Sequence, residues 1–118
     1  MEKFRPQREE EFWTGERIFM TELLNHENEP DVSLAIGRVE PGVTTQLHSL
    51  SVDERYVVKS GTAMMEVDGG PPFQIGPGDC VRIPANVSQR CTNVGSEDFV
   101  IYCVCTPRFT PPVYTALD

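Results

Sequence analysis

The sequence predicts an all-β protein with a single domain, and three observations lead to this prediction. The 118 residues are enough for one hydrophobic core and leave no room for a second. Ten prolines and nine glycines are spread along the chain, which is typical of many short elements joined by turns. After residue 25 no segment has the apolar spacing of a three-turn helix. We therefore expect a sandwich or small barrel of antiparallel strands.

The predicted strands are short apolar runs that end at glycine, proline or polar residues. They cover residues 18–24, 32–39, 44–48, 55–59, 62–67, 73–75, 80–83, 89–93 and 99–105. The apolar alternation of 32–39 changes phase near Gly37, which predicts a bulge or bend there. A single helical turn is expected at 8–13, within the charged N-terminal arm. The proline-containing end, 106–118, cannot form a central strand, because proline lacks the backbone donor.

The charge of the chain argues against two classes of partner. Ten basic and eighteen acidic residues leave a net charge of −8. Such a chain repels phosphate backbones and anionic lipid surfaces, so we expect neither a nucleic-acid partner nor a membrane partner. No apolar run is long enough to cross a bilayer.

The N-terminal residues MEKFRPQREEEF contain no apolar segment of the kind that a secretory signal requires. We therefore expect a cytoplasmic protein. In that compartment its cysteines would be reduced thiols rather than a disulfide framework. Those cysteines are Cys80, Cys91, Cys103 and Cys105.

Two motifs follow one another in the middle of the chain. The first is G-x5-H-x-L-x3-E-x6-G, from Gly42 to Gly61, and the second is P-G-D-x-V-x-I-P-x-x-V-x-Q-x3-N, from Pro77 to Asn93. Their order and separation resemble those of the cupin family, in particular the small single-domain, RmlC-like members. The resemblance implies a conical jelly-roll barrel over 32–105. It leaves 1–31 as an N-terminal arm with a first strand and 106–118 as a C-terminal extension.

The same resemblance implies a site for a divalent metal. Cupins hold one ion with three histidines and a glutamate, and the corresponding positions here are His48, Leu50, Glu54 and Gln89. Leucine cannot bind a metal, and the amide oxygen of glutamine is a weak neutral ligand. A reduced set of His48, Glu54 and Gln89 could hold zinc, manganese, iron or nickel with water completing the shell, or could hold no metal.

Strand periodicity predicts a pocket at the same place. Residues two apart on a strand face the same way, so His48 and Leu50 would point inward together. The same argument groups the residues of two later strands into one mostly apolar pocket, which is typical of a small-molecule site. The predicted pocket residues are Leu50, Tyr56, Val58 and Cys91, with His48, Glu54 and Gln89 as the polar groups.

Three classes of function are compatible with such a pocket. The first is a metal-dependent enzyme, an isomerase or epimerase before a dioxygenase, acting on a small organic molecule. The second is a metal-free enzyme in which His48 is the acid or base and Glu54 orients it. The third is a barrel that binds a small molecule without converting it.

The two ends of the chain carry apolar residues that the motifs do not explain. These lie in 18–24 and at Phe109, Val113 and Tyr114. The resemblance implies that such segments join two copies, so we expect a two-fold homodimer. The alternative is that each arm folds back over its own barrel and buries the same residues.

Overall fold

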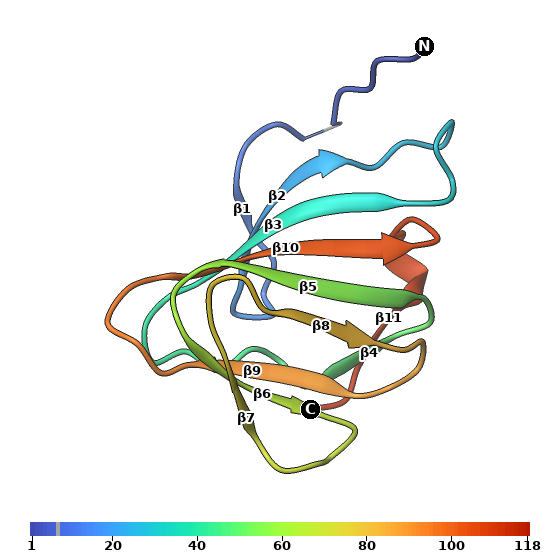
Figure 1. The fold of residues 1–118 in the computed structure, drawn as a ribbon. Helices are drawn as coiled ribbons and strands as arrows, with labels where there is room; N and C mark the ends of the chain where they lie inside the picture. Colours follow the sequence, from blue (N-terminus) through green and yellow to red (C-terminus); the bar gives the residue numbers. More distant parts are fainter. Residues whose placement is uncertain (7) are drawn as a thin grey trace.

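The computed structural model describes residues 1–6 and 8–118, and this part of the chain forms two antiparallel sheets packed face to face (Figure 1). The first sheet has the order β1 (Phe12–Trp13), β2 (Phe19–Leu24), β3 (Ser33–Val39), β10 (Phe99–Thr106), β5 (Asp53–Ser60), β8 (Cys80–Ile83). The second has the order β11 (Tyr114–Ala116), β4 (His48–Leu50), β9 (Gln89–Asn93), β6 (Ala63–Val67), β7 (Phe73–Ile75). This is a jelly roll, and it confirms the predicted fold class.

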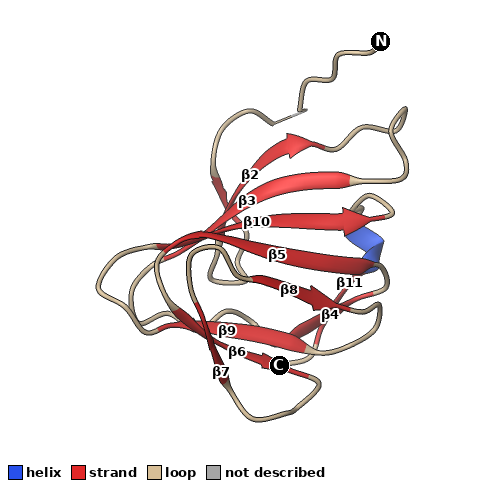
Figure 2. Ribbon diagram, viewed as in Figure 1, coloured by secondary structure: helices blue, strands red, loops and turns tan. Residues whose placement is uncertain are grey.

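Among the described residues, helix is confined to one short turn, the 3-10 element η1 (Pro111–Val113), drawn in blue in Figure 2. In the part of the chain that the structure describes, no helix has the length and apolar character needed to cross a membrane.

The core lies between the sheets and follows the two-residue period of the strands. In β10, Phe99, Ile101, Cys103 and Cys105 are buried while the residues between them are only half-buried. Residues of β5 alternate in the same way. Because β10 and β5 are adjacent, their inward side chains form one continuous layer against the second sheet.

Of the bulge or bend predicted near Gly37, the bulge is not found. The register of β3 runs without interruption past Gly37 on both sides, and the irregularity lies instead in β2, between Glu22 and Leu24. Gly37 serves close packing: a Cβ there would lie 2.8 Å from Ile18 Cδ1. The glycine therefore lets Ile18 into the core.

Two other local predictions are also wrong. Residues 8–13 contain no helical turn in their described part, because Phe12 and Trp13 pair with β2. The strand expected at 44–48 is confined to β4, which begins only at His48. Before it, the chain already lies against β9, through the isolated bridge between Thr44 and Thr92 and the bond from the Thr45 amide to the Cys91 carbonyl. The Gln46 amide donates instead to the Glu16 carbonyl, which interrupts the ladder with β9 before it resumes at His48.

Both terminal segments pack on the barrel of their own chain. β2 pairs with β3, and β11 pairs with β4 as an edge strand. The edge position suits a segment that follows two prolines. Each terminus thus contributes a wall to the space between the sheets.

Candidate functional site

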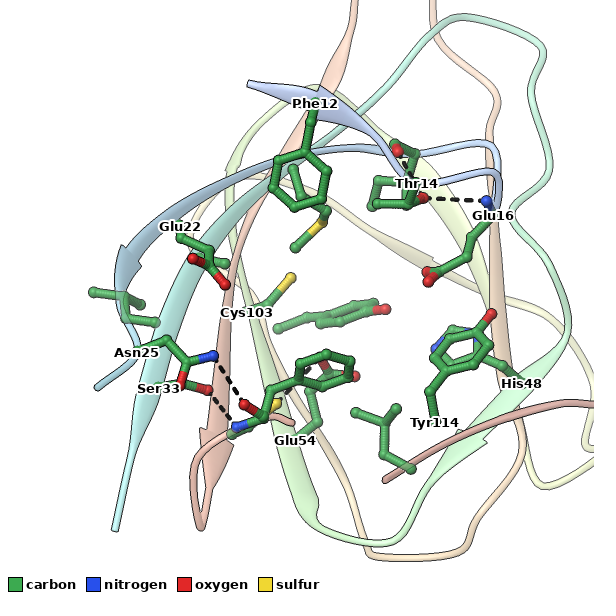
Figure 3. Close-up of a pocket in the computed structure, with 18 of the residues that line it drawn as sticks. Phe12, Thr14, Glu16, Glu22, Asn25, Ser33, His48, Glu54, Cys103 and Tyr114 are labelled. Carbon is green, nitrogen blue, oxygen red and sulfur yellow. Dashed lines mark hydrogen bonds between the residues drawn. The ribbon is translucent and has the colours of Figure 1, made fainter. Parts of the chain in front are cut away.

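A cavity of about 380 Å³ lies inside the barrel, between the first sheet and the strands β4 and β11 (Figure 3). Most of its wall is apolar or aromatic, with contributions from Phe12, Ile18, Met20, Leu50, Tyr56 and Phe109. A few polar side chains from distant parts of the chain converge on it, among them Glu16, His48 and Glu54. An apolar cavity with a few placed polar groups is the usual form of a small-molecule site.

His48, the first residue of β4, is held in one orientation. Its Nδ1 lies 2.8 Å from the carbonyl oxygen of Gln46, so Nδ1 carries the proton and donates to that oxygen. The ring stacks on Tyr114, with 4.9 Å between ring centroids and 14° between planes. Nε2 has no hydrogen-bond partner among the described residues and is not fully buried. His48 lines the cavity, so a ligand there could reach this unprotonated nitrogen.

Glu54, on β5, is the most deeply buried carboxylate of the site, with 6% of its surface exposed. The Gln89 amide nitrogen donates to Glu54 Oε1 at 2.8 Å, and the Cys105 thiol lies 3.7 Å from Oε2. Gln89 also faces His48 across the β4–β9 pair. Gln89 therefore binds Glu54 through its side chain and lies opposite His48 in the strand pair.

The titration of these groups is shifted by burial. Burial raises the pKa of Glu54 to about 7, the charge of Glu16 adds to the rise, and the bonds from Gln89 and Cys105 oppose it. Burial also lowers the pKa of His48, against the opposing effects of the Gln46 carbonyl and Asp118. Near neutral pH the wall of one cavity thus carries both a neutral imidazole and a carboxyl group that is partly protonated.

Two cavity carboxylates come from the N-terminal segment, which lies outside the two motifs and was not part of the predicted site. Glu22 lies on β2 between Met20 and Leu24, and all three line the cavity. A glutamate in the apolar phase of a strand is a signal that the sequence does contain. Glu16 lies in the turn before β2 and has no such signal. Burial raises the pKa of Glu16 to about 7.

The residues expected at the site fall into three groups: those that line the cavity, one that is buried behind it, and those in the core cluster. His48, Leu50, Glu54 and Tyr56 all line the cavity. Gln89 is fully buried and reaches the site only through Glu54. Val58 and Cys91 belong to the core cluster and do not line the cavity. The cavity is displaced from them toward the N-terminal strands, since β2 and β3 supply much of its wall.

The donor set does not fit the metal that the motifs imply. Among residues 1–6 and 8–118, no three His, Cys, Asp or Glu side chains are grouped so that they could hold one ion. Leu50 fills one of the four positions, and the Gln89 amide nitrogen, which cannot ligate, is turned toward Glu54. The Gln89 oxygen is buried without a partner. This leaves one imidazole, one carboxylate and at most one neutral amide oxygen, a weaker set than the three histidine, cysteine or carboxylate ligands of catalytic metal sites.

Comparison with known proteins agrees with the architecture. A family model described as "Cupin domain" matches residues 35–105. A search of curated proteins finds no match to the sequence.

Several solved structures have the same fold. A Streptomyces PAC13 variant with uridine superposes with a TM-score of 0.80 and 18% identity, covering 99% of this chain and 92% of that one. KdgF from Halomonas sp. superposes with a TM-score of 0.74 and 17% identity, covering 85% of this chain and 87% of that one. An RmlC-like cupin from Shewanella frigidimarina NCIMB 400 superposes with a TM-score of 0.73 and 16% identity, covering 91% of this chain and 92% of that one. At such identities the likeness concerns the fold alone.

Proposed function

Since the chain belongs to the cupin family, we propose that it binds a small organic molecule in the barrel cavity and acts on it by metal-independent acid–base chemistry. The reaction class is a proton transfer of the kind that isomerases and epimerases perform. The observation that carries the proposal is the pairing of a neutral His48 with a partly protonated Glu54 in one apolar cavity.

His48 is the base in this proposal. Its Nδ1–H is committed to the Gln46 carbonyl, so Nε2 presents a lone pair to the cavity. Stacking on Tyr114 restricts rotation of the ring. A base held in one tautomer and one orientation loses little entropy when it removes a proton from a bound molecule.

Glu54 is the acid. A carboxyl group with a pKa of about 7 is protonated in a large fraction of molecules at neutral pH and can return a proton to another atom of the ligand. Gln89 holds one carboxyl oxygen by an amide bond. When Glu54 gives up its proton, that bond stabilises the anion. Two groups whose environments assign them opposite roles are the usual mark of an acid–base pair.

Metal-dependent isomerase and dioxygenase activity, which the motifs also implied, is not proposed. Both need more protein ligands than His48 and Glu54 supply, and no further His, Cys, Asp or Glu in the described part of the chain joins them.

A second candidate is binding without conversion. The observation that favours it is the origin of the cavity walls: β1, β2 and β11, all from the terminal segments, enclose the same space as the barrel strands. Such enclosure would also suit a protein that retains a ligand. The Streptomyces PAC13 structure with uridine supports a small organic ligand in either case.

The test is an untargeted comparison of a metabolite extract before and after incubation with untagged protein. We expect a small set of compounds to change with the wild type, with or without EDTA, and not with His48→Asn. The amide nitrogen of asparagine corresponds to Nδ1 of histidine and can still donate to the Gln46 carbonyl, so folding should be retained. Activity that EDTA abolishes and added metal restores would contradict the proposal. Compounds that are retained but unchanged would favour the binding candidate.

A further inference from the structure

Glu16 lies in a closed turn between β1 and β2. Two hydrogen bonds from Thr14 to the carbonyl oxygen of Ile18 close this turn. The backbone amide donates at 3.2 Å and the hydroxyl at 2.9 Å. The Thr14 hydroxyl also accepts from the Glu16 amide at 3.1 Å. The flanking residues Gly15 and Arg17 both have positive φ, 82° and 66°. For arginine this conformation is strained, so surrounding contacts must hold it.

Those contacts tie the turn to the barrel. The Gln46 amide donates to the Glu16 carbonyl at 3.0 Å, and Arg17 Nε donates to the Thr44 carbonyl at 2.6 Å. The backbone is thus fixed on both sides of Glu16 against the segment that leads to His48. In Figure 3 the Glu16 carboxylate points into the cavity, on the side where His48 and Tyr114 lie.

The Glu16 carboxylate accepts no hydrogen bond and forms no ion pair with any described residue. Some other carboxylates of the chain have cationic partners: Glu11 binds Arg38, and Glu66 binds Arg90. Glu16 is half-buried, and burial alone raises its pKa to about 7. A carboxylate fixed in a cavity wall and left without a donor is suited to a donor that arrives with a ligand.

The other ionisable groups that line the cavity are mainly acidic. Glu22 and Glu54 line it, while the basic lining residue, Arg8, is exposed, with its guanidinium carbon 4.3 Å from the centroid of the Phe12 ring. His48 is neutral near pH 7 because burial lowers its pKa. An anion in this cavity would meet carboxylates without a buried cation to balance them.

We infer that Glu16 is a ligand-contacting residue that selects the charge of the ligand. The molecule it accepts is neutral or cationic and donates a hydrogen bond to the Glu16 carboxylate, as an amine or an alcohol does. Carboxylates and phosphates are rejected. The inference rests on the proposed function in one respect, that the cavity is the ligand site.

The experiment uses three probes of one shape and different charge: benzylamine, benzyl alcohol and benzoate. Each is titrated at pH 8 into ¹⁵N-labelled full-length protein, and amide shifts of cavity residues report binding. We expect benzylamine and benzyl alcohol to shift cavity residues, and benzoate to bind at least about tenfold more weakly than benzylamine. Glu16→Gln should reduce that ratio severalfold. Glu40→Gln removes the same charge from an exposed turn and should leave the ratio unchanged.

Two results would overturn the inference while leaving the cavity as a ligand site: benzoate binding in the cavity as well as benzylamine, or the same ratio in Glu16→Gln as in the wild type. A different result would overturn the proposed function, and the inference with it. In that case none of the three probes would shift any cavity residue, although the spectrum remained that of a folded protein.

Discussion

Gln89 donates its side-chain amide to Glu54 at 2.8 Å, while its own carbonyl oxygen is buried without a partner among the described residues. In the motif that the sequence matches, this position belongs to a metal ligand. Here the side chain binds a carboxylate instead. The amide stabilises the ionised form of Glu54 and thereby limits the rise in its pKa that burial causes.

This contact predicts the effect of Gln89→Met. Methionine has a similar volume but no donor, so the ionised form of Glu54 loses a charge-assisted hydrogen bond. We expect the pKa of Glu54 to rise further, by about one unit. Carboxyl-carbon NMR titration would measure it. Gln74→Met, at an exposed site on β7, is the matched control. An unchanged Glu54 titration in Gln89→Met would contradict the assigned role.

The raised pKa of Glu54 predicts how stability depends on pH. The ordinary value is 4.5 and the folded value is about 7, so between these pH values the folded protein binds the proton more strongly than the unfolded chain. Stability is therefore lost as pH rises from 4.5 to 7, by up to about 3 kcal/mol from this group.

Glu54→Gln isolates this effect, because glutamine keeps an acceptor for Gln89 but does not ionise. Urea denaturation of both proteins from pH 4.5 to 8 should show the wild type losing stability relative to the variant across that window, with no further relative change above it. A constant difference at every pH would mean that Glu54 is not buried as a titrating group.

The side chains at the four motif positions predict that the wild type binds metal weakly. They also show which substitutions should create strong binding. We expect untagged wild type to contain less than stoichiometric metal. Leu50→His combined with Gln89→His supplies the two imidazoles that the family motif has at these positions, and we expect the double variant to gain Zn²⁺ affinity by at least about a hundredfold.

Calorimetric titration with Zn²⁺ would measure this gain. The control carries the same two substitutions at exposed positions, Leu23→His with Gln74→His. Equal gains in both double variants would show that positions 50 and 89 do not face a common ion. Tight stoichiometric binding by the wild type would contradict the metal-free proposal.

The packing around Gly37 predicts a local effect on stability. A methyl group there would lie 2.8 Å from Ile18 Cδ1 and 3.3 Å from Ile101 Cγ1. We expect Gly37→Ala to destabilise the fold by about 1–3 kcal/mol, since the core must shift to admit it. Gly76→Ala meets no atom within 4 Å and should be close to neutral. Thermal denaturation of both variants tests the pair, and equal melting temperatures would contradict the prediction.

The homodimer remains a prediction. The edge strand β1 exposes Trp13 to 51%, which leaves an aromatic surface for a second copy. We expect sedimentation equilibrium over a micromolar range to give the dimer mass, and Trp13→Lys to weaken association. Phe73→Lys, at an exposed aromatic residue on β7, is the control. A single species at monomer mass for the wild type would rule the dimer out.

The sequence by itself determined the architecture and part of the cavity. Turn residues separate the strands, and the period of two places His48 with Leu50 and Glu54 with Tyr56 on inward faces. These are local relations, since each depends on residues a few positions apart. The period of two therefore sufficed to predict that these four residues face inward, while the jelly roll was implied by the resemblance of the two motifs to the cupin family.

Only the tertiary structure decided which segments complete the cavity. Glu16, Glu22 and Tyr114 reach it because β2 pairs with β3 and β11 pairs with β4, and no local pattern specifies which strand edges meet. Strand pairing depends on backbone groups that every residue carries, so a short edge segment does not encode its partner in its side chains. The direction of the Gln89 amide was decided in the same way, by the buried carboxylate opposite it.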